Sequence, residues 1–239
     1  MKREPRPTPS AEDGRELRIH VSPGVTVSGL LLIPPKATCL YLLAHGAGAG
    51  MRHPFMSSVA HGLAAREIAT LRYQFRYMDQ GSRRPDPPKV AHATVRAAVL
   101  AARDAMPRFP LLAGGKSYGG RMTSQAQAET ALPGVVGLAF FGFPLHPAGQ
   151  PSVERAEHLS SIRVPMLFIQ GSRDALAAPE LMAKVLERLR DRATLAEVPG
   201  GDHSLHVPAR SGRNDQEVLD TALDAFRVWA SRVAEMSWG

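Results

Sequence analysis

The chain has 239 residues, 44% of them hydrophobic and 21% charged, which is ordinary for a globular protein with one sizeable core. No apolar run approaches the roughly 18–20 residues of a membrane-spanning helix, and no apolar stretch follows the basic start of the chain, as it does in a secretory signal. The formal net charge is +7, but the arginines are dispersed among acidic residues without a nucleic-acid-binding motif, so neither a membrane nor a nucleic acid is expected as a partner.

The first part of the chain predicts a β-hairpin. Residues 1–15 are polar and contain prolines, so we expect a disordered tail there and a single domain over 16–239. Apolar and polar residues alternate over 17–21, and Ser22-Pro23-Gly24 supplies a turn before the apolar segment 25–33. This pattern is typical of two antiparallel strands.

Short apolar runs without alternation follow, and such runs indicate strands buried on both faces, as in a parallel sheet. They occupy residues 39–44, 68–71, 111–113, 135–143 and 166–169, and a further strand is expected over 194–198. The single cysteine, Cys39, lies in the first run and has no partner for an intramolecular disulfide. We therefore expect a reducing, cytoplasmic setting.

Helical patterns lie between these runs. They cover residues 55–66, 90–106, 118–131, a segment that begins at Pro179, and 215–236. Alternation of strand and helix along the whole chain predicts βαβ units with right-handed crossovers. The expected fold is therefore α/β, with a mostly parallel central sheet, an antiparallel hairpin at its start and helices on both faces.

The segment Gly114-Gly115-Lys116-Ser117-Tyr118-Gly119-Gly120 joins a predicted strand to a predicted helix. A serine that projects from the top of a sheet sits on a sharp strand-to-helix turn, and the residues two before and two after it pack against neighbouring backbone. Both of these, Gly115 and Gly119, are small. The segment therefore predicts that Ser117 is a nucleophile.

Two nucleotide-binding interpretations fail on spacing. A phosphate-binding loop ending in Gly115-Lys116-Ser117 needs a glycine five residues earlier, where Pro110 stands. A dinucleotide fingerprint starting at Gly46 needs its third glycine where Met51 stands. Neither nucleotide is expected as a cofactor.

The glycine-rich segment that follows the strand 39–44 has another use. Acyl transfer passes through a tetrahedral oxyanion, which two preorganised donors stabilise. We expect the backbone amides of Ala47 and Tyr118 to be these donors, while a plain strand-to-helix connection is the alternative interpretation of residues 45–48. His45 is expected to hold this segment by local hydrogen bonds.

A serine nucleophile needs a base, and the base needs an orienting carboxylate. Asp174 follows the predicted strand 166–169, and His203 follows the predicted strand 194–198, in the chain order Ser, Asp, His. We expect these two residues to be the carboxylate and the base. His206 is the competing base, and Asp202 is expected to shape the turn.

One further side chain, Lys116, stands beside the expected nucleophile. Lys116 is expected to point below the turn and pair with an acid, with binding of an anionic substrate as the alternative. The scattered histidines show no metal-binding signature, so no metal is expected.

Four segments carry these features: LLAHGAGAG (42–50), GGKSYGGR (114–121), FIQGSRDALAAPE (168–180) and GGDHSL (200–205). Together they resemble the small, lidless group of predicted α/β-superfamily hydrolases, which is distantly similar to the dienelactone hydrolases. The resemblance implies an α/β-hydrolase fold and a triad of Ser117, Asp174 and His203. Dienelactone hydrolases carry cysteine where this chain has Ser117, so their particular activity is not implied.

The surroundings of the site are expected to be open. The interval 143–164 holds only about twenty residues, too few for a cap domain. The rim is expected to combine this loop with the loop 76–88. The latter is part of an expected basic loop, 72–89, whose role the sequence does not assign. Residues expected to form the wall are Met51, Phe55, Tyr77, Phe143, Leu145 and His146.

The sequence thus predicts a serine hydrolase that cleaves small carboxylic esters through an acyl-enzyme on Ser117, without a cofactor. An open site favours short-chain or bulky esters. A thioesterase or peptidase-type acyl hydrolase is the alternative within enzymes, and a non-catalytic binding protein on a hydrolase fold is the alternative of another class. The protein is expected to be a monomer or homodimer.

Overall fold

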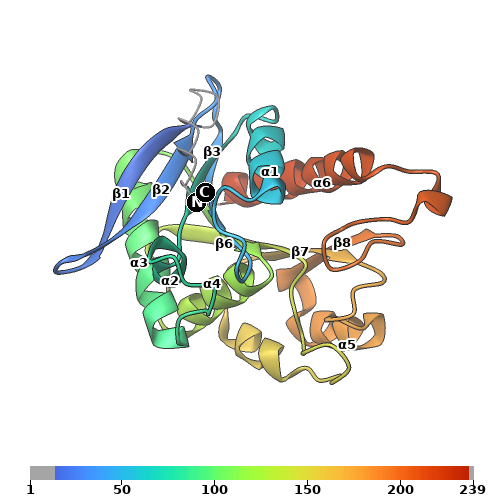
Figure 1. Ribbon diagram of the computed structural model, residues 1–239. Helices are drawn as coiled ribbons and strands as arrows, with labels where there is room; N and C mark the ends of the chain where they lie inside the picture. The colour runs from blue at the N-terminus through green and yellow to red at the C-terminus, as the bar shows by residue number, and fades with distance from the viewer. Residues whose placement is uncertain (1–13, 237–239) are drawn as a thin grey trace, which may run out of the picture.

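The computed structural model describes residues 14–236, which form one eight-stranded sheet in the order β1-β2-β4-β3-β5-β6-β7-β8 (Figure 1). The first two strands pair antiparallel, β2 pairs antiparallel with β4, and every later pairing is parallel. The strands are β1 (Arg15–Ser22), β2 (Val25–Leu32), β3 (Cys39–Ala44), β4 (Ile68–Tyr73), β5 (Leu111–Lys116), β6 (Val135–Phe141), β7 (Met166–Gly171) and β8 (Ala193–Val198). The expected α/β fold, hairpin included, is confirmed.

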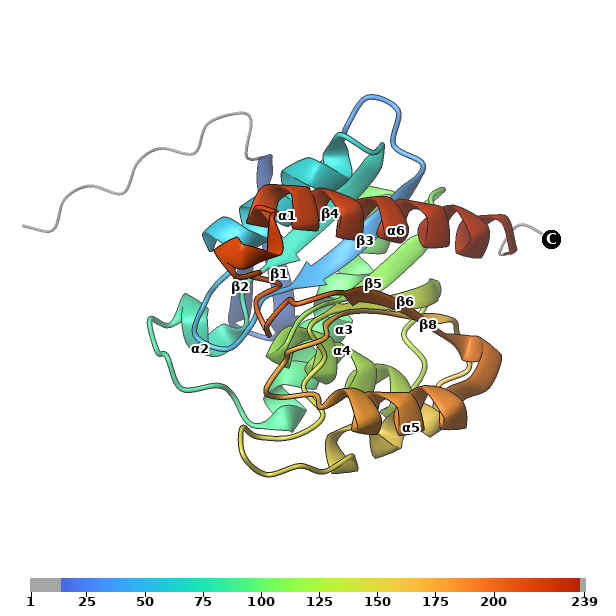
Figure 2. The ribbon, with the colours of Figure 1, turned by 90° about the vertical axis from the view of Figure 1, so that its right-hand side faces the viewer.

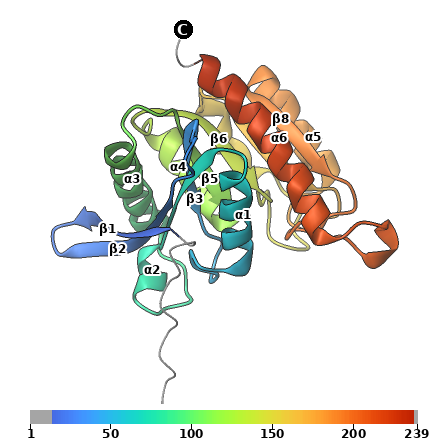
Figure 3. The same ribbon diagram turned by 90° about the horizontal axis from the view of Figure 1, so that it is seen from above.

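Helices cover both faces of the sheet. They are α1 (Pro54–Ala64), α2 (Arg76–Asp79), α3 (Pro88–Ala105), α4 (Tyr118–Glu129), α5 (Pro179–Leu189) and α6 (Asp215–Met236). In Figure 2, α1 and α6 lie on one side of the sheet, and α3, α4 and α5 lie on the other. Seen from above in Figure 3, the β1–β2 hairpin and the β8–α5 unit mark the two ends of the sheet. Prolines stand in the first turns of α1, α3 and α5, where the missing backbone N–H costs nothing.

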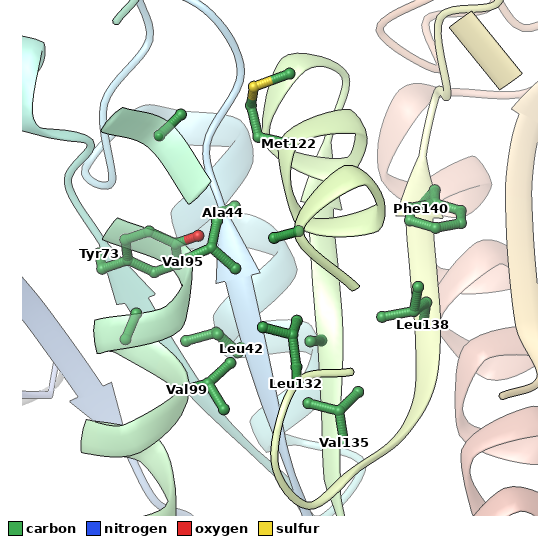
Figure 4. Close-up of a cluster of buried hydrophobic side chains, with 14 of the residues drawn as sticks. Leu42, Ala44, Tyr73, Val95, Val99, Met122, Leu132, Val135, Leu138 and Phe140 are labelled. Atoms are coloured by element: carbon green, nitrogen blue, oxygen red, sulfur yellow. The ribbon is translucent and has the colours of Figure 1, made fainter. Parts of the chain in front are cut away.

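Each face of the sheet has its own apolar core, because the buried side chains of the parallel strands point alternately to either side. Figure 4 shows part of the core under α3 and α4, where Val95 and Val99 lie beside Leu42 and Ala44 of β3. The other core packs α1 and α6 against side chains such as Tyr41. These two cores fix the strands whose carboxyl ends carry the site.

The segment 72–89 differs from the expected basic loop. Arg72 belongs to β4 and is fully buried, with one guanidinium nitrogen 2.8 Å from the hydroxyl of Ser57. Arg76 begins the short helix α2, and Lys89 lies in the first turn of α3. The expectation of one basic loop is therefore wrong, because its charges are divided among a strand, two helices and the connection between them.

The connection between β6 and β7 contains one regular element, the 3₁₀ helix η2 (Glu154–Ser161), and residues 142–165 form no cap domain. Most of the expected tail, residues 1–13, lies outside the described residues, while β1 already begins at Arg15. Among residues 14–236, no helix is both long and apolar enough to cross a membrane.

Candidate active site

The carboxyl ends of β5, β7 and β8 each lead into a segment that contributes one polar side chain to the site. Ser117 follows β5 directly, Asp174 lies three positions after the end of β7, and His203 lies in the loop after β8. Parallel strands end at the same edge of a sheet, which is where open α/β sheets place their ligands. The fold thus brings together three residues that are far apart in sequence.

The turn at Ser117 is enforced by close backbone packing. Ser117 has φ +50° and ψ −114°, a conformation that residues with a side chain rarely adopt. A Cβ atom on Gly115 would lie 2.1 Å from the carbonyl oxygen of Ala44, and one on Gly119 would lie 2.5 Å from that of His45. Both positions therefore exclude any side chain, which explains the glycines around the strained serine.

A continuous hydrogen-bonded chain joins the three side chains. Nε2 of His203 lies 2.8 Å from Oγ of Ser117, and Nδ1 of His203 lies 2.7 Å from Oδ2 of Asp174. The Asp174 carboxylate is fully buried and accepts further hydrogen bonds, from Nε2 of Gln170 at 2.5 Å and from the backbone N–H of Leu176 at 2.8 Å. These bonds fix the orientation of the carboxylate, so it can hold the imidazole with Nε2 free to accept the serine proton.

Three hydrogen bonds hold the loop after β3, one within the loop and two to the segment after β4. The fully buried imidazole of His45 accepts the N–H of Phe75 on Nε2 at 3.1 Å, so Nδ1 carries the proton and donates to the carbonyl oxygen of Gly46 at 2.7 Å. Burial lowers the pKa of His45 to about 4, which keeps this imidazole neutral. Gly48 donates its N–H to the hydroxyl of Tyr77 at 3.1 Å. His45 thus holds the loop in place, as expected, and both of its ring nitrogens are bonded to backbone groups.

The two expected oxyanion donors are the backbone amides of Tyr118, the residue after Ser117, and Ala47, which lines the same cavity. Tyr118 is the first residue of α4, so its N–H has no acceptor within the helix. Ala47 is exposed and lines the same cavity as Ser117. The amide of Tyr118 is held by the strained turn at Ser117, and the amide of Ala47 lies in the loop that His45 and Tyr77 hold in place.

Ser117 and His203 open into a cavity of about 340 Å³ with a mostly apolar lining. Its lining residues are Gly46, Ala47, Ala49, His53, Phe55, Met56, Lys116, Ser117, Leu176, His203 and Ser204. This volume is at the small end of ligand sites in proteins, so the cavity suits a small acyl or alcohol group.

Of the six residues expected to form the wall, Phe55 alone lines this cavity. Phe143 and Leu145 are fully buried in the core under α4 and α5, and His146 is buried with its ring bonded to the carbonyl of Pro147. Tyr77 turns its hydroxyl toward the loop after β3. Met51 faces a neighbouring cavity of about 430 Å³ on the other side of that loop. For these five residues the expectation does not fit the described cavity, because each side chain packs inward or away from Ser117.

The alternative base, His206, lies outside the hydrogen-bonded chain. Its Nδ1 is 2.8 Å from the carboxylate of Asp215, and this bond raises the pKa of the exposed His206. Asp202 accepts the N–H groups of Ser204 and His206 and thereby shapes the turn, as expected. His203 is thus the histidine that the loop presents to Ser117.

The placement of Lys116 also differs from the expectation. Its Nζ donates to the backbone carbonyl oxygen of His203 and lies 5.6 Å from the ring centroid of Phe55. Within residues 14–236 it forms no ion pair with a carboxylate, contrary to the expectation. Burial lowers the pKa of Lys116 to about 8. The sequence did show a lysine at the end of a strand, next to the expected nucleophile, but it did not show where the lysine side chain points.

Comparison with known proteins places this geometry in context. A family model described as an alpha/beta hydrolase domain matches residues 37–231. Among solved structures, a Xanthomonas campestris α/β serine hydrolase without a lid is 19% identical, covers 91% of this chain and 95% of its own, and superposes with a TM-score of 0.69. An esterase domain from a Rhodothermus marinus protein is 18% identical (91% and 98% covered, TM-score 0.69), and a dienelactone hydrolase from Anabaena variabilis is 23% identical (92% and 96% covered, TM-score 0.67). At these identities the likeness shows the fold.

Proposed function

Because the chain belongs to the alpha/beta hydrolase domain family, we propose that it is a serine hydrolase that cleaves carboxylic esters through an acyl-enzyme on Ser117. The observation that carries the proposal is the unbroken hydrogen-bonded chain Ser117–His203–Asp174 at the carboxyl edge of the sheet. A serine hydroxyl is a weak nucleophile, and this chain supplies both the base and the carboxylate that orients it.

In the acylation step, Oγ of Ser117 attacks the ester carbonyl while Nε2 of His203 takes the hydroxyl proton. Asp174 holds the imidazole through Nδ1 and stabilises the imidazolium that forms. The imidazolium then gives its proton to the leaving alcohol oxygen, and the carbon–oxygen bond of the ester breaks. The acyl group remains on Ser117.

The negative charge on the carbonyl oxygen is stabilised by the amides of Ala47 and Tyr118. Neither donor has to reorganise during the reaction, because one sits on the first turn of α4 and the other on a loop fixed by His45 and Tyr77. In the second step, His203 deprotonates a water molecule that attacks the acyl carbon. The imidazolium then returns the proton to Oγ of Ser117 as the bond between Oγ and the acyl carbon breaks, and the acid is released.

The substrate proposed is a small-molecule ester with a short acyl chain. The cavity beside Ser117 is about 340 Å³ and mostly apolar, and within residues 14–236 no cap domain covers it. An esterase domain and a dienelactone hydrolase among the structural neighbours favour ester chemistry over amide chemistry. We further propose that the protein works in the cytoplasm, as a monomer or homodimer, which fits the lone and buried Cys39.

A panel of short esters, long-chain esters, thioesters, lactones and peptides tests the proposal with the purified full chain. Short esters should be hydrolysed fastest, and Ser117→Ala should remove that activity while thermal stability stays close to that of the parent. Hydrolysis of short esters that persists in Ser117→Ala, or turnover of peptides or long-chain lipids alone, contradicts the proposal.

A further inference from the structure

Lys116 contacts the base of the proposed reaction although it belongs to the strand of the nucleophile. It is the last residue of β5, directly before Ser117, and its Nζ donates to the backbone carbonyl of His203. The same ammonium group lies over the ring of Phe55 and lines the cavity that Ser117 and His203 share. One side chain therefore links the two segments that must meet for proton transfer.

Gly142 leaves the space in which this contact forms. Gly142 has φ +64°, and a Cβ atom on it would lie 2.7 Å from Nζ of Lys116 and 2.8 Å from the carbonyl oxygen of His203. Any side chain here would press on both the donor and the acceptor. Three segments, the ends of β5 and β6 and the loop after β8, are thus mutually fitted around this one hydrogen bond.

The loop that carries His203 is already tied to the β7 side. The N–H of Arg173 donates to the carbonyl of Gly201 at 2.8 Å, and the N–H of Gly200 donates to the hydroxyl of Ser172 at 2.8 Å. On the opposite side, toward β5, the backbone of this loop is held by Lys116. The loop is therefore fixed between the strand of the carboxylate and the strand of the nucleophile.

We propose that Lys116 is a positioning residue for the hydrolytic reaction. Its ammonium group holds the backbone carbonyl of His203 and so keeps the imidazole within hydrogen-bonding distance of both Ser117 and Asp174. The inference rests on the proposed function of Ser117 and adds a residue to it. Lys116 acts through His203 and forms no bond with the substrate. Misplacement of a catalytic group by about 1 Å can lower a rate by about a hundredfold, so one contact of this kind has a measurable effect.

The charge on Lys116 makes this role dependent on pH. The titratable groups that face it are Asp174 after β7, Asp202 and His203 after β8, and His53 before α1, and the two carboxylates oppose the effect of burial. With a pKa of about 8, the strongly donating ammonium form persists below that pH, and a more weakly donating amine replaces it above. The rate should therefore fall as the pH rises through about 8.

The lowered pKa of Lys116 also distinguishes a positioning role of this residue from a role in stabilising the fold. A folded-state pKa below the ordinary 10.5 means that the charged form destabilises the fold at pH values below about 8, and that this cost fades as the pH rises from about 8 toward 10.5. Replacement of Lys116 by the uncharged, similarly shaped methionine removes this cost at neutral pH. Lys116→Met should therefore lose activity without losing thermal stability.

The test uses the full chain with a fluorophosphonate probe and a short ester, over about pH 6 to 10. Lys116→Met should be phosphonylated at least about tenfold more slowly than the parent, with the loss in kcat and not in KM, and with an unchanged or higher Tm at pH 7. Lys116→Arg, which keeps a donor that stays charged, should recover part of the rate and lose the decline near pH 8. Lys184→Met, the same change on an exposed lysine of α5, should leave both rates unchanged.

Labelling of Lys116→Met at the parent rate overturns the inference, as does a parallel fall of Tm and rate, or a decline near pH 8 that Lys116→Arg retains. These results leave the proposed function intact as long as the parent reacts at Ser117. A folded parent that does not react contradicts the proposed function itself, and the inference falls with it.

Discussion

Ser117 and His203 meet in one hydrogen bond but are held in place by different physical means. The segment of Ser117 is fixed by contact between backbones, since Gly115 and Gly119 lie against the carbonyls of Ala44 and His45 with no room for a Cβ atom. The segment of His203 is fixed by hydrogen bonds to side chains and backbone of neighbouring loops. The glycine contacts leave no room for a side chain and do not depend on pH. The hydrogen bonds can be removed one at a time by mutation, and those that involve a titratable side chain change with pH.

This difference predicts where changes act. A side chain added at Gly115 or Gly119 should affect folding first. Loss of a hydrogen-bonding group that holds His203, such as Asp174 or Lys116, should affect the reaction first. The four predictions that follow test or sharpen that contrast, in order of decreasing effect.

Asp174→Asn removes the carboxylate of the His203 side and keeps its shape. The amide cannot stabilise an imidazolium and favours the wrong tautomer of His203, so kcat should fall by about 10⁴-fold. The protein should stay folded with a modest fall in Tm, because the N–H of Leu176 keeps an oxygen acceptor while Nε2 of Gln170 loses one. The measurement is steady-state hydrolysis of a short ester together with a thermal melt; a loss of folding in place of a loss of rate contradicts the contrast.

Gly119→Ala adds one methyl group on the Ser117 side. Its Cβ would lie 2.5 Å from the carbonyl oxygen of His45, and such overpacking costs about 1–3 kcal/mol or more. The free energy of unfolding, measured in denaturant, should fall accordingly. Gly149→Ala is the matched control: no atom lies within 4 Å of its added Cβ, so it carries only the strain of φ +72°. Equal losses for the two variants would show that close backbone contact does not enforce the turn.

Gly142→Ala disturbs the contact of Lys116 with His203 from a third segment. The added Cβ would lie 2.7 Å from Nζ of Lys116 and 2.8 Å from the backbone carbonyl oxygen of His203, at a φ of +64°, so activity should fall severalfold. The phosphonylation rates of Gly142→Ala, Lys116→Met and the double variant give the coupling. If the effects of the two changes simply multiply, they act independently and the shared contact does not explain them.

His206→Ala should have the smallest effect, although His206 lies three residues from His203. The exposed ion pair with Asp215 raises the pKa of His206, so its stabilisation is present below the ordinary value of 6.5 and is lost as the pH rises through the raised pKa. Activity at pH 7.5 to 8 should be unchanged, and Tm should drop slightly at pH 5.5 to 6 only. A large loss of activity would identify His206 as part of the reaction.

The sequence predicted most strands and the edge of the sheet that bears the site. Apolar runs without alternation locate β3 to β7 because strands buried on both faces need no polar side, and helix α6 is confirmed over residues 215–236. Ser117, Asp174 and His203 follow the parallel strands β5, β7 and β8, so their common edge follows from the fold. The short elements α2 and η2 were missed because four to eight residues carry too little periodicity.

The surroundings of the site were less predictable. Whether Phe143 and Leu145 face the core or the cavity depends on a bend after β6 that no period in the sequence encodes. The direction of Lys116 depends on the space that Gly142 leaves, 26 positions later in the chain (142 − 116). Contacts between long side chains and loop glycines form through tertiary packing, so they cannot be predicted from a local sequence pattern.

Localisation of a fluorophosphonate adduct tests the central claim most directly. The folded parent is treated with the probe and digested, and the modified residue is identified by tandem mass spectrometry. A single adduct on Ser117 is predicted, because His203 can accept the proton of that hydroxyl at 2.8 Å. No adduct on the folded protein, or an adduct on Ser204 in the same cavity and not on Ser117, would contradict the account.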